Sequence, residues 1–126
     1  MMNADHALRR LAVIAPAMQE ALAHLAADWS AAEIPTVVAF GALGSALRGH
    51  LNEMSSERLS GIAEFVEEIL VSDDAALKDA VATGFLEAFV SADGPEPSRL
   101  VLVLGPVAQG YLRAWDTFAG ARTPGL

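Results

Sequence analysis

Apolar residues recur at steps of three and four along almost the whole chain, which predicts helices rather than strands. Asn3 or Asp5 is expected to cap the first helix. Pro16 is expected to kink or split this helix because proline has no backbone N–H to donate. The apolar stripe of this segment comprises Leu8, Leu11, Ala15, Met18, Leu22, Leu25 and Trp29.

A second helix is predicted over 35–51, after a link at 30–33. Pro35 suits its first position, and Arg48 is its only charged residue. Gly41, Gly44 and Ser45 form a strip of small residues, and each interior glycine costs about 1 kcal/mol relative to alanine. We therefore expect this helix to be the most buried element and to approach a neighbour closely through the strip.

Two amphipathic helices follow. The first covers 56–71 and is capped by Ser55 or Ser56. The second starts at 72–74, where Asp74 is one candidate cap, and ends at 93–95, where Asp-Gly-Pro stops it. Their expected inward residues are apolar at helical spacing: Leu59, Ile62, Val66, Ile69, Leu70, Leu77, Val81, Phe85, Leu86 and Phe89.

The C-terminal part contains one ambiguous segment. Residues 100–104 read LVLVL, which suits a strand, but no other segment offers a partner strand. A short helix capped by Ser98 is therefore favoured over the strand. A last helix is predicted over 106–119, with its apolar positions, Trp115 among them, facing the core and Asp116 reaching solvent or a neighbouring arginine. These inward positions are Val107, Tyr111, Leu112, Trp115 and Phe118.

Together these segments predict an all-α fold. The 126 residues match one domain, since domains most often have about 100–150 residues. We expect a single helical domain over 1–126, with about five main helices in antiparallel hairpins and one short helix. Residues 1–3 and 121–126 are expected to fray.

Charge is distributed unevenly along the chain. The net charge is −8, yet residues 53–96 alone carry eleven acidic and two basic residues. Such a balance argues against a nucleic-acid partner, which requires clustered lysine and arginine. The longest uncharged stretch, 34–47, has fourteen residues, fewer than the roughly 20 that span a bilayer. With no targeting segment recognised, we expect a cytoplasmic protein that does not enter a membrane.

Candidate chemistry is sparse. The chain has no cysteine, which excludes disulfides and thiolate chemistry. Glu20, His24 and Asp28 share one side of a helix, but they lack the spacing of known di-iron and zinc motifs. No nucleophile elbow or phosphate-binding loop is present. We therefore expect a non-enzymatic protein with no catalytic residue, cofactor or metal.

Several short motifs carry a family resemblance. These are Trp29 with 33–36 (EIPT), 40–44 (FGALG), 81–87 (VATGFLE), 104–106 (LGP) and 111–116 (YLRAWD). Over residues 28–119 the chain resembles a group of small, acidic, all-helical bacterial proteins of unknown function, some of them similar to immunity proteins of toxin–immunity systems. The resemblance implies a protein that neutralises a toxin domain by contact, and it implies no catalytic residues.

The leading hypothesis is a helical binding module whose acidic 53–96 region meets a basic, toxin-like protein. A self-associating protein, such as a homodimer joined through the small-residue strip, is one alternative. A small-ligand carrier or an enzyme with a cavity between its helices is another. The residues expected to contact the partner are the acidic side chains Glu64, Glu67, Glu68, Asp73, Asp74 and Asp79.

Overall fold

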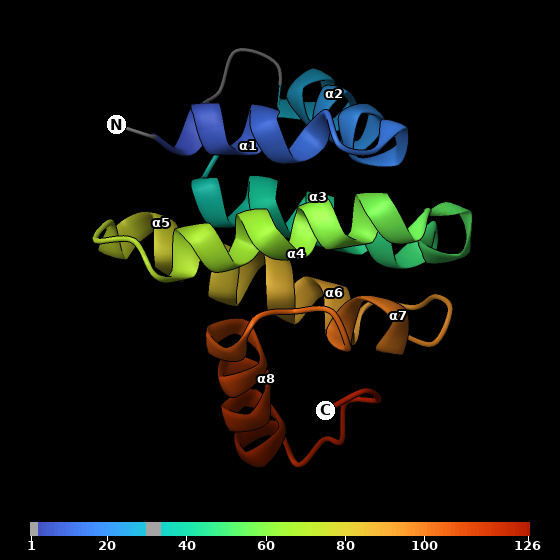
Figure 1. Ribbon diagram of the computed structural model, residues 1–126. Coiled ribbons are helices and arrows are strands. Elements are labelled where there is room, and N and C mark those ends of the chain that lie inside the picture. Colours follow the sequence, from blue (N-terminus) through green and yellow to red (C-terminus); the bar gives the residue numbers. More distant parts are fainter. Residues whose placement is uncertain (1–2, 30–33) are drawn as a thin grey trace.

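The computed structural model describes residues 3–29 and 34–126, and these two ranges contain helices and no strand (Figure 1). The all-α fold class is therefore confirmed. The predicted link at 30–33 lies outside the described residues. In chain order the elements are α1 (Ala4–Ala12), α2 (Pro16–Trp29), α3 (Thr36–Gly49), the 3-10 turn η1 (Leu51–Glu53), α4 (Ser56–Leu70), α5 (Ala75–Asp79), the π-helical η2 (Ala80–Leu86), α6 (Glu87–Ser91), α7 (Ser98–Val101) and α8 (Pro106–Ala119).

Side-chain caps begin three of these helices where the sequence predicted them. The Asn3 side chain accepts a hydrogen bond from the His6 backbone N–H at 2.8 Å. Ser55 caps α4, and Asp74 caps α5 by accepting from the Leu77 N–H at 3.0 Å. Asn3 thus caps α1, while residues 1–2, the remainder of the segment expected to fray, lie outside the described part. Pro16 splits the first helix as predicted, since α1 ends before it and α2 begins with it.

Helix α3 lies at the centre of the fold, where it contacts α1, α2, η2 and α6. Its closest neighbour is η2, and a glycine on each side makes this approach possible. A Cβ added to Gly44 would overlap the backbone of Phe85, and one added to Gly84 would lie 2.7 Å from the Val37 carbonyl oxygen. The small-residue strip is therefore used inside the molecule at Gly44, and Ser45 beside it is exposed. Gly44 itself is therefore covered by the Phe85 backbone and is not open to a second copy.

The most buried segment is η2 rather than α3, so the sequence prediction was wrong on this point. Six of its seven residues are buried, because η2 lies between α3, α4 and α8. By contrast, Val37 and Val38 of α3 remain 43% and 38% exposed. Elements α5, η2 and α6 follow one another without a break, and their predicted inward residues, including Val81, are all buried.

Residues 100–104 do not form a strand. Ser98 to Val101 form the short helix α7, and Leu100, Val101 and Leu104 are buried in the core. Ser98 is the first residue of this helix and not its cap. Its backbone N–H and its hydroxyl both donate to the Glu96 carboxylate, at 2.7 and 2.6 Å. These hydrogen bonds lower the pKa of Glu96 below its ordinary value.

Helix α8 corrects the sequence prediction most strongly. Its buried residues are Ala108 and Leu112, whereas Phe118 is 85% exposed and Val107 is 43% exposed. The prediction was correct for Leu112, which is buried, and wrong for Val107 and Phe118, because the buried face is centred on Ala108 and Leu112. Trp115 is half-buried rather than a core residue. Figure 1 shows why: α8 packs through its N-terminal half, and its C-terminal half projects from the other helices.

The C-terminal segment 121–126, which was expected to fray, is folded back against α8 and α7. Thr123 is buried, and its backbone N–H and its hydroxyl donate to the Asp116 carboxylate at 2.8 and 2.6 Å. Asp116 therefore holds the tail instead of reaching solvent or an arginine. Further along, Gly125 packs closely against Ser98 and Val101, so the tail covers one side of α7.

Candidate protein-binding surface

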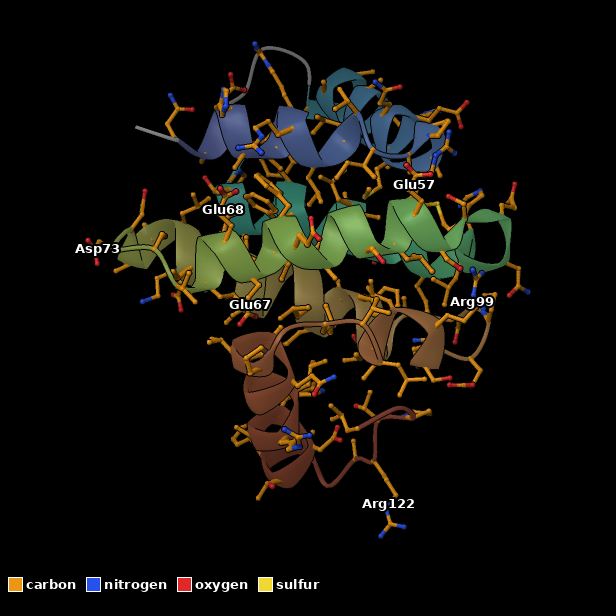
Figure 2. The ribbon with its side chains drawn as sticks, in the orientation of Figure 1. Glu57, Glu67, Glu68, Asp73, Arg99 and Arg122 are labelled. Carbon is orange, nitrogen blue, oxygen red and sulfur yellow. The ribbon has the colours of Figure 1, made fainter. Side chains whose placement is uncertain are left out.

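Exposed carboxylates follow the outer side of α4 and the turn after it. Glu57, Glu64 and Glu68 are separated by seven and four residues, which places them on one helix face, and all three are exposed. Asp73 extends the row beyond the end of α4, as Figure 2 shows. These four residues, Glu57, Glu64, Glu68 and Asp73, are called the α4 acidic surface below.

One arginine borders this surface. The Arg10 guanidinium lies 4.5 Å from the centre of the Phe65 ring and 3.7 Å from the Glu68 carboxylate. Both charged side chains are about half-exposed, so solvent screens the pair and it contributes little to stability. Within residues 3–29 and 34–126, the side chains of Glu64 and Asp73 form no ion pair or hydrogen bond. Their charges therefore remain directed at solvent.

Glu67 has an internal role that the sequence prediction missed. Its carboxylate turns toward α8 (Figure 2) and accepts hydrogen bonds from the backbone N–H groups of Val107 and Ala108 at 2.9 and 3.0 Å. A helix leaves its first N–H groups without partners, and a negative charge there also complements the helix dipole. Glu67 thus caps α8 from another helix. Gly105 allows this approach, since a Cβ there would lie 2.7 Å from the Glu67 Cγ.

The other two predicted site residues lie at the ends of α5. Asp74 is occupied as the α5 cap, so its carboxylate has a structural role. Asp79 is exposed at the last residue of α5. Asp79 lies close enough to Tyr111 that its charge, with that of Glu87, helps to raise the tyrosine pKa. Of the six predicted contact residues, Glu64, Glu68, Asp73 and Asp79 present carboxylates to solvent, whereas Glu67 and Asp74 mainly cap helices.

A hydrogen-bonded pair lies where α8 meets α6. The Tyr111 hydroxyl donates to the Glu87 carboxylate. Burial raises the pKa of Tyr111 above its ordinary value, and the hydrogen bond to Glu87 raises it further. The phenol thus stays protonated and serves as a donor that anchors α8. Glu87 was not identified from the sequence, because nothing in its spacing distinguishes it from a solvated carboxylate.

An open groove adjoins the α4 acidic surface, and its floor is apolar. It has a volume of about 340 Å³. Val71 and Val103 remain 62% and 45% exposed there, which leaves apolar surface in contact with water. This α4 groove is lined by Ala63, Glu64, Glu67, Glu68 and Val71 on one side and by Val103 and Gly105 on the other. The sequence prediction missed the groove because Val71 and Val103 belong to different segments that only the fold brings together.

The remaining candidates for chemistry lie apart from this groove. Glu20, His24 and Asp28 are all exposed on α2. In the described part of the chain, no group of three or more metal-ligating side chains could hold an ion. None of the helices described is long and apolar enough to cross a membrane.

Comparison with known proteins identifies a family but no characterised relative. A domain of unknown function (DUF7674) matches residues 8–109. This range includes the α4 groove and ends inside α8. No curated protein and no solved structure matches the chain.

Proposed function

The chain belongs to the family of the DUF7674 domain, whose function is unknown, and we propose that it is a non-enzymatic module that binds a basic protein through its α4 acidic surface. The observation that carries this proposal is the concentration of charge: residues 53–96 hold eleven of the sixteen acidic residues. Four exposed carboxylates from this region line one side of α4 and the turn after it. A surface of one sign attracts partners of the opposite sign and speeds their encounter.

The adjoining apolar groove offers binding affinity that the charges alone do not supply. Exposed charge pairs contribute little affinity because water and salt screen them. Burial of apolar surface contributes about 25 cal/mol per Å², and Val71 and Val103 offer such surface next to Glu64 and Glu68. A partner that presents an apolar side chain between basic ones fits this arrangement. A basic toxin domain is one protein of that kind, which would make the chain an immunity-like protein of the bacterial cytoplasm.

Charge reversal tests the proposal. Partner capture from the native cell is compared for the wild-type protein and the Glu64→Lys/Asp73→Lys double variant, neither position being a helix cap. The matched control is Glu20→Lys/Asp28→Lys, which makes the same charge change on the exposed side of α2. We expect the first variant to lose the captured partner and the control to keep it, with the interaction weakening as salt rises. Equal capture by all three proteins would show that the α4 acidic surface does not bind.

A further inference from the structure

The C-terminal half of α8 exposes an aromatic side chain of a kind that soluble proteins usually cover. Phe118 is 85% exposed, and the half-buried Trp115 lies beside it with ring centres 6.2 Å apart. Aromatic side chains of this size dominate binding energy when they are buried at an interface. This end of α8, with Trp115, Phe118 and the tail residue Arg122, is called the α8 tip.

The α8 tip also carries positive charge, in contrast to the acidic 53–96 region. Arg113, Asp116 and Arg122 are the charged residues of 113–122, and the Asp116 carboxylate is occupied by Thr123. Both arginines are exposed, and Figure 2 shows Arg122 pointing away from the body of the molecule. The α8 tip therefore combines an exposed ring with positive charge.

The α4 groove is the counterpart of the α8 tip. Its floor is apolar, with Val71 and Val103 exposed, and Glu64 and Glu68 contribute carboxylates to its lining. The α8 tip and the α4 groove thus carry opposite charges and both expose apolar surface, and they lie on two different parts of one molecule.

A single molecule cannot join these two surfaces to each other. Gly105 lines the groove immediately before α8 begins, whereas Phe118 lies near the other end of that helix. Phe118 lies twelve residues after Pro106, which corresponds to about 18 Å along the helix at 1.5 Å per residue. Contact between the α8 tip and the α4 groove therefore requires a second copy.

We propose that the α8 tip of one molecule docks in the α4 groove of a second molecule. Phe118 packs on Val71 and Val103, and Arg122 of the tip approaches Glu64 and Glu68. Because the two surfaces differ, the pair keeps one free groove, on the molecule that gave its tip, and one free tip, on the molecule that gave its groove. Such head-to-tail contacts build rings or open chains rather than a closed symmetric dimer. Self-association and a basic partner would then compete for the same carboxylates.

Sedimentation of the purified full chain from micromolar to millimolar concentration tests this arrangement. The average mass is expected to rise with concentration and to pass that of a dimer. Phe118→Ser removes the ring from the tip, and Glu64→Lys/Val103→Ser alters the groove. Each change should weaken association about tenfold or more. Val13→Ser removes another exposed apolar side chain, 65% exposed at the end of α1, and should leave association unchanged. Circular dichroism verifies that each variant is folded.

Mixing the two variants distinguishes head-to-tail contact from other modes of association. The Phe118→Ser protein retains an intact groove, and the groove variant retains an intact tip. The equimolar mixture should therefore form a one-to-one complex and nothing larger, although each variant alone is monomeric. A wild-type protein that stays monomeric throughout, a symmetric dimer that persists in both variants, or a mixture that does not associate would each overturn the proposal. None of these results bears on the capture of a basic partner, which the charge-reversal experiment decides separately.

Discussion

Replacement of Gly44 by alanine probes the contact on which the fold is centred. The added Cβ would overlap the Phe85 carbonyl oxygen and lie 3.1 Å from the Phe85 carbonyl carbon and 3.2 Å from the Phe89 nitrogen. All three atoms belong to the backbone, so no side-chain rotation relieves the overlap. Helix α3 and the η2–α6 segment would have to move apart.

The size of the effect follows from two opposing contributions. Overpacking of a close contact costs about 1–3 kcal/mol, and contact with backbone places Gly44→Ala near the upper end. The higher helix propensity of alanine offsets this loss by stabilising the folded protein by about 1 kcal/mol. The expected net loss is about 2 kcal/mol, which for a domain of this size lowers the melting temperature by about 6–10 °C.

Gly41→Ala is the matched control on the same helix. Its added Cβ would lie 3.8 Å from the Gly84 carbonyl oxygen and 4.0 Å from the Ala88 Cβ, which is ordinary van der Waals contact. This variant should therefore be more stable than the wild type by about 0.5–1 kcal/mol. Thermal and urea unfolding of both variants measure the difference. If Gly44→Ala is as stable as Gly41→Ala, the close approach of α3 to η2 is refuted.

Three further predictions concern α8. Glu67→Ala should lower the free energy of unfolding by about 0.5–2 kcal/mol, because the α8 cap is lost. The control Glu64→Ala on the same helix should change it by under about 0.5 kcal/mol. Equal urea midpoints for the two variants would contradict the capping role of Glu67. Leu112→Ala should lower the free energy of unfolding by about 2–5 kcal/mol, and Trp115→Ala should lower it by about 1 kcal/mol. If thermal unfolding shows Trp115→Ala to be the less stable variant, Trp115 is a core residue after all. The pKa of Tyr111 is raised in the folded protein, so the unfolded chain loses the phenol proton at a lower pH than the folded chain does. The free energy of unfolding should therefore fall as pH rises above about 10. Urea titrations of Tyr111→Phe should show a smaller fall over the same pH range.

Local signals in the sequence were sufficient to locate most helices. The caps at Asn3, Ser55 and Asp74 act within three residues of chain, so their effect is readable from the sequence. The split at Pro16 is equally local, since it depends only on the missing N–H of proline. The predicted inward residues of 56–91 were also correct, because these helices are amphipathic and contact neighbours along their whole length.

These local signals did not predict which face of α8 is buried. Its aromatic residues mark one stripe, but the buried face is the one that carries Ala108 and Leu112. Helical periodicity gives the spacing of a stripe and not the depth to which a helix is inserted. Only the first half of α8 reaches the core, so Phe118 remains exposed although its spacing matches that of a core residue.

The sequence by itself determined the all-α class, the helix starts and the concentration of acidic residues in 53–96, because these depend on composition and on contacts between residues a few positions apart. The tertiary structure alone decided which carboxylates remain available. Glu67 and Glu68 are adjacent in the chain and chemically identical. The approach of Gly105 and α8 makes Glu67 a helix cap, whereas Glu68 points to solvent beside Arg10. The same packing joins Val71 and Val103 in one groove, a surface that no spacing within a single helix specifies.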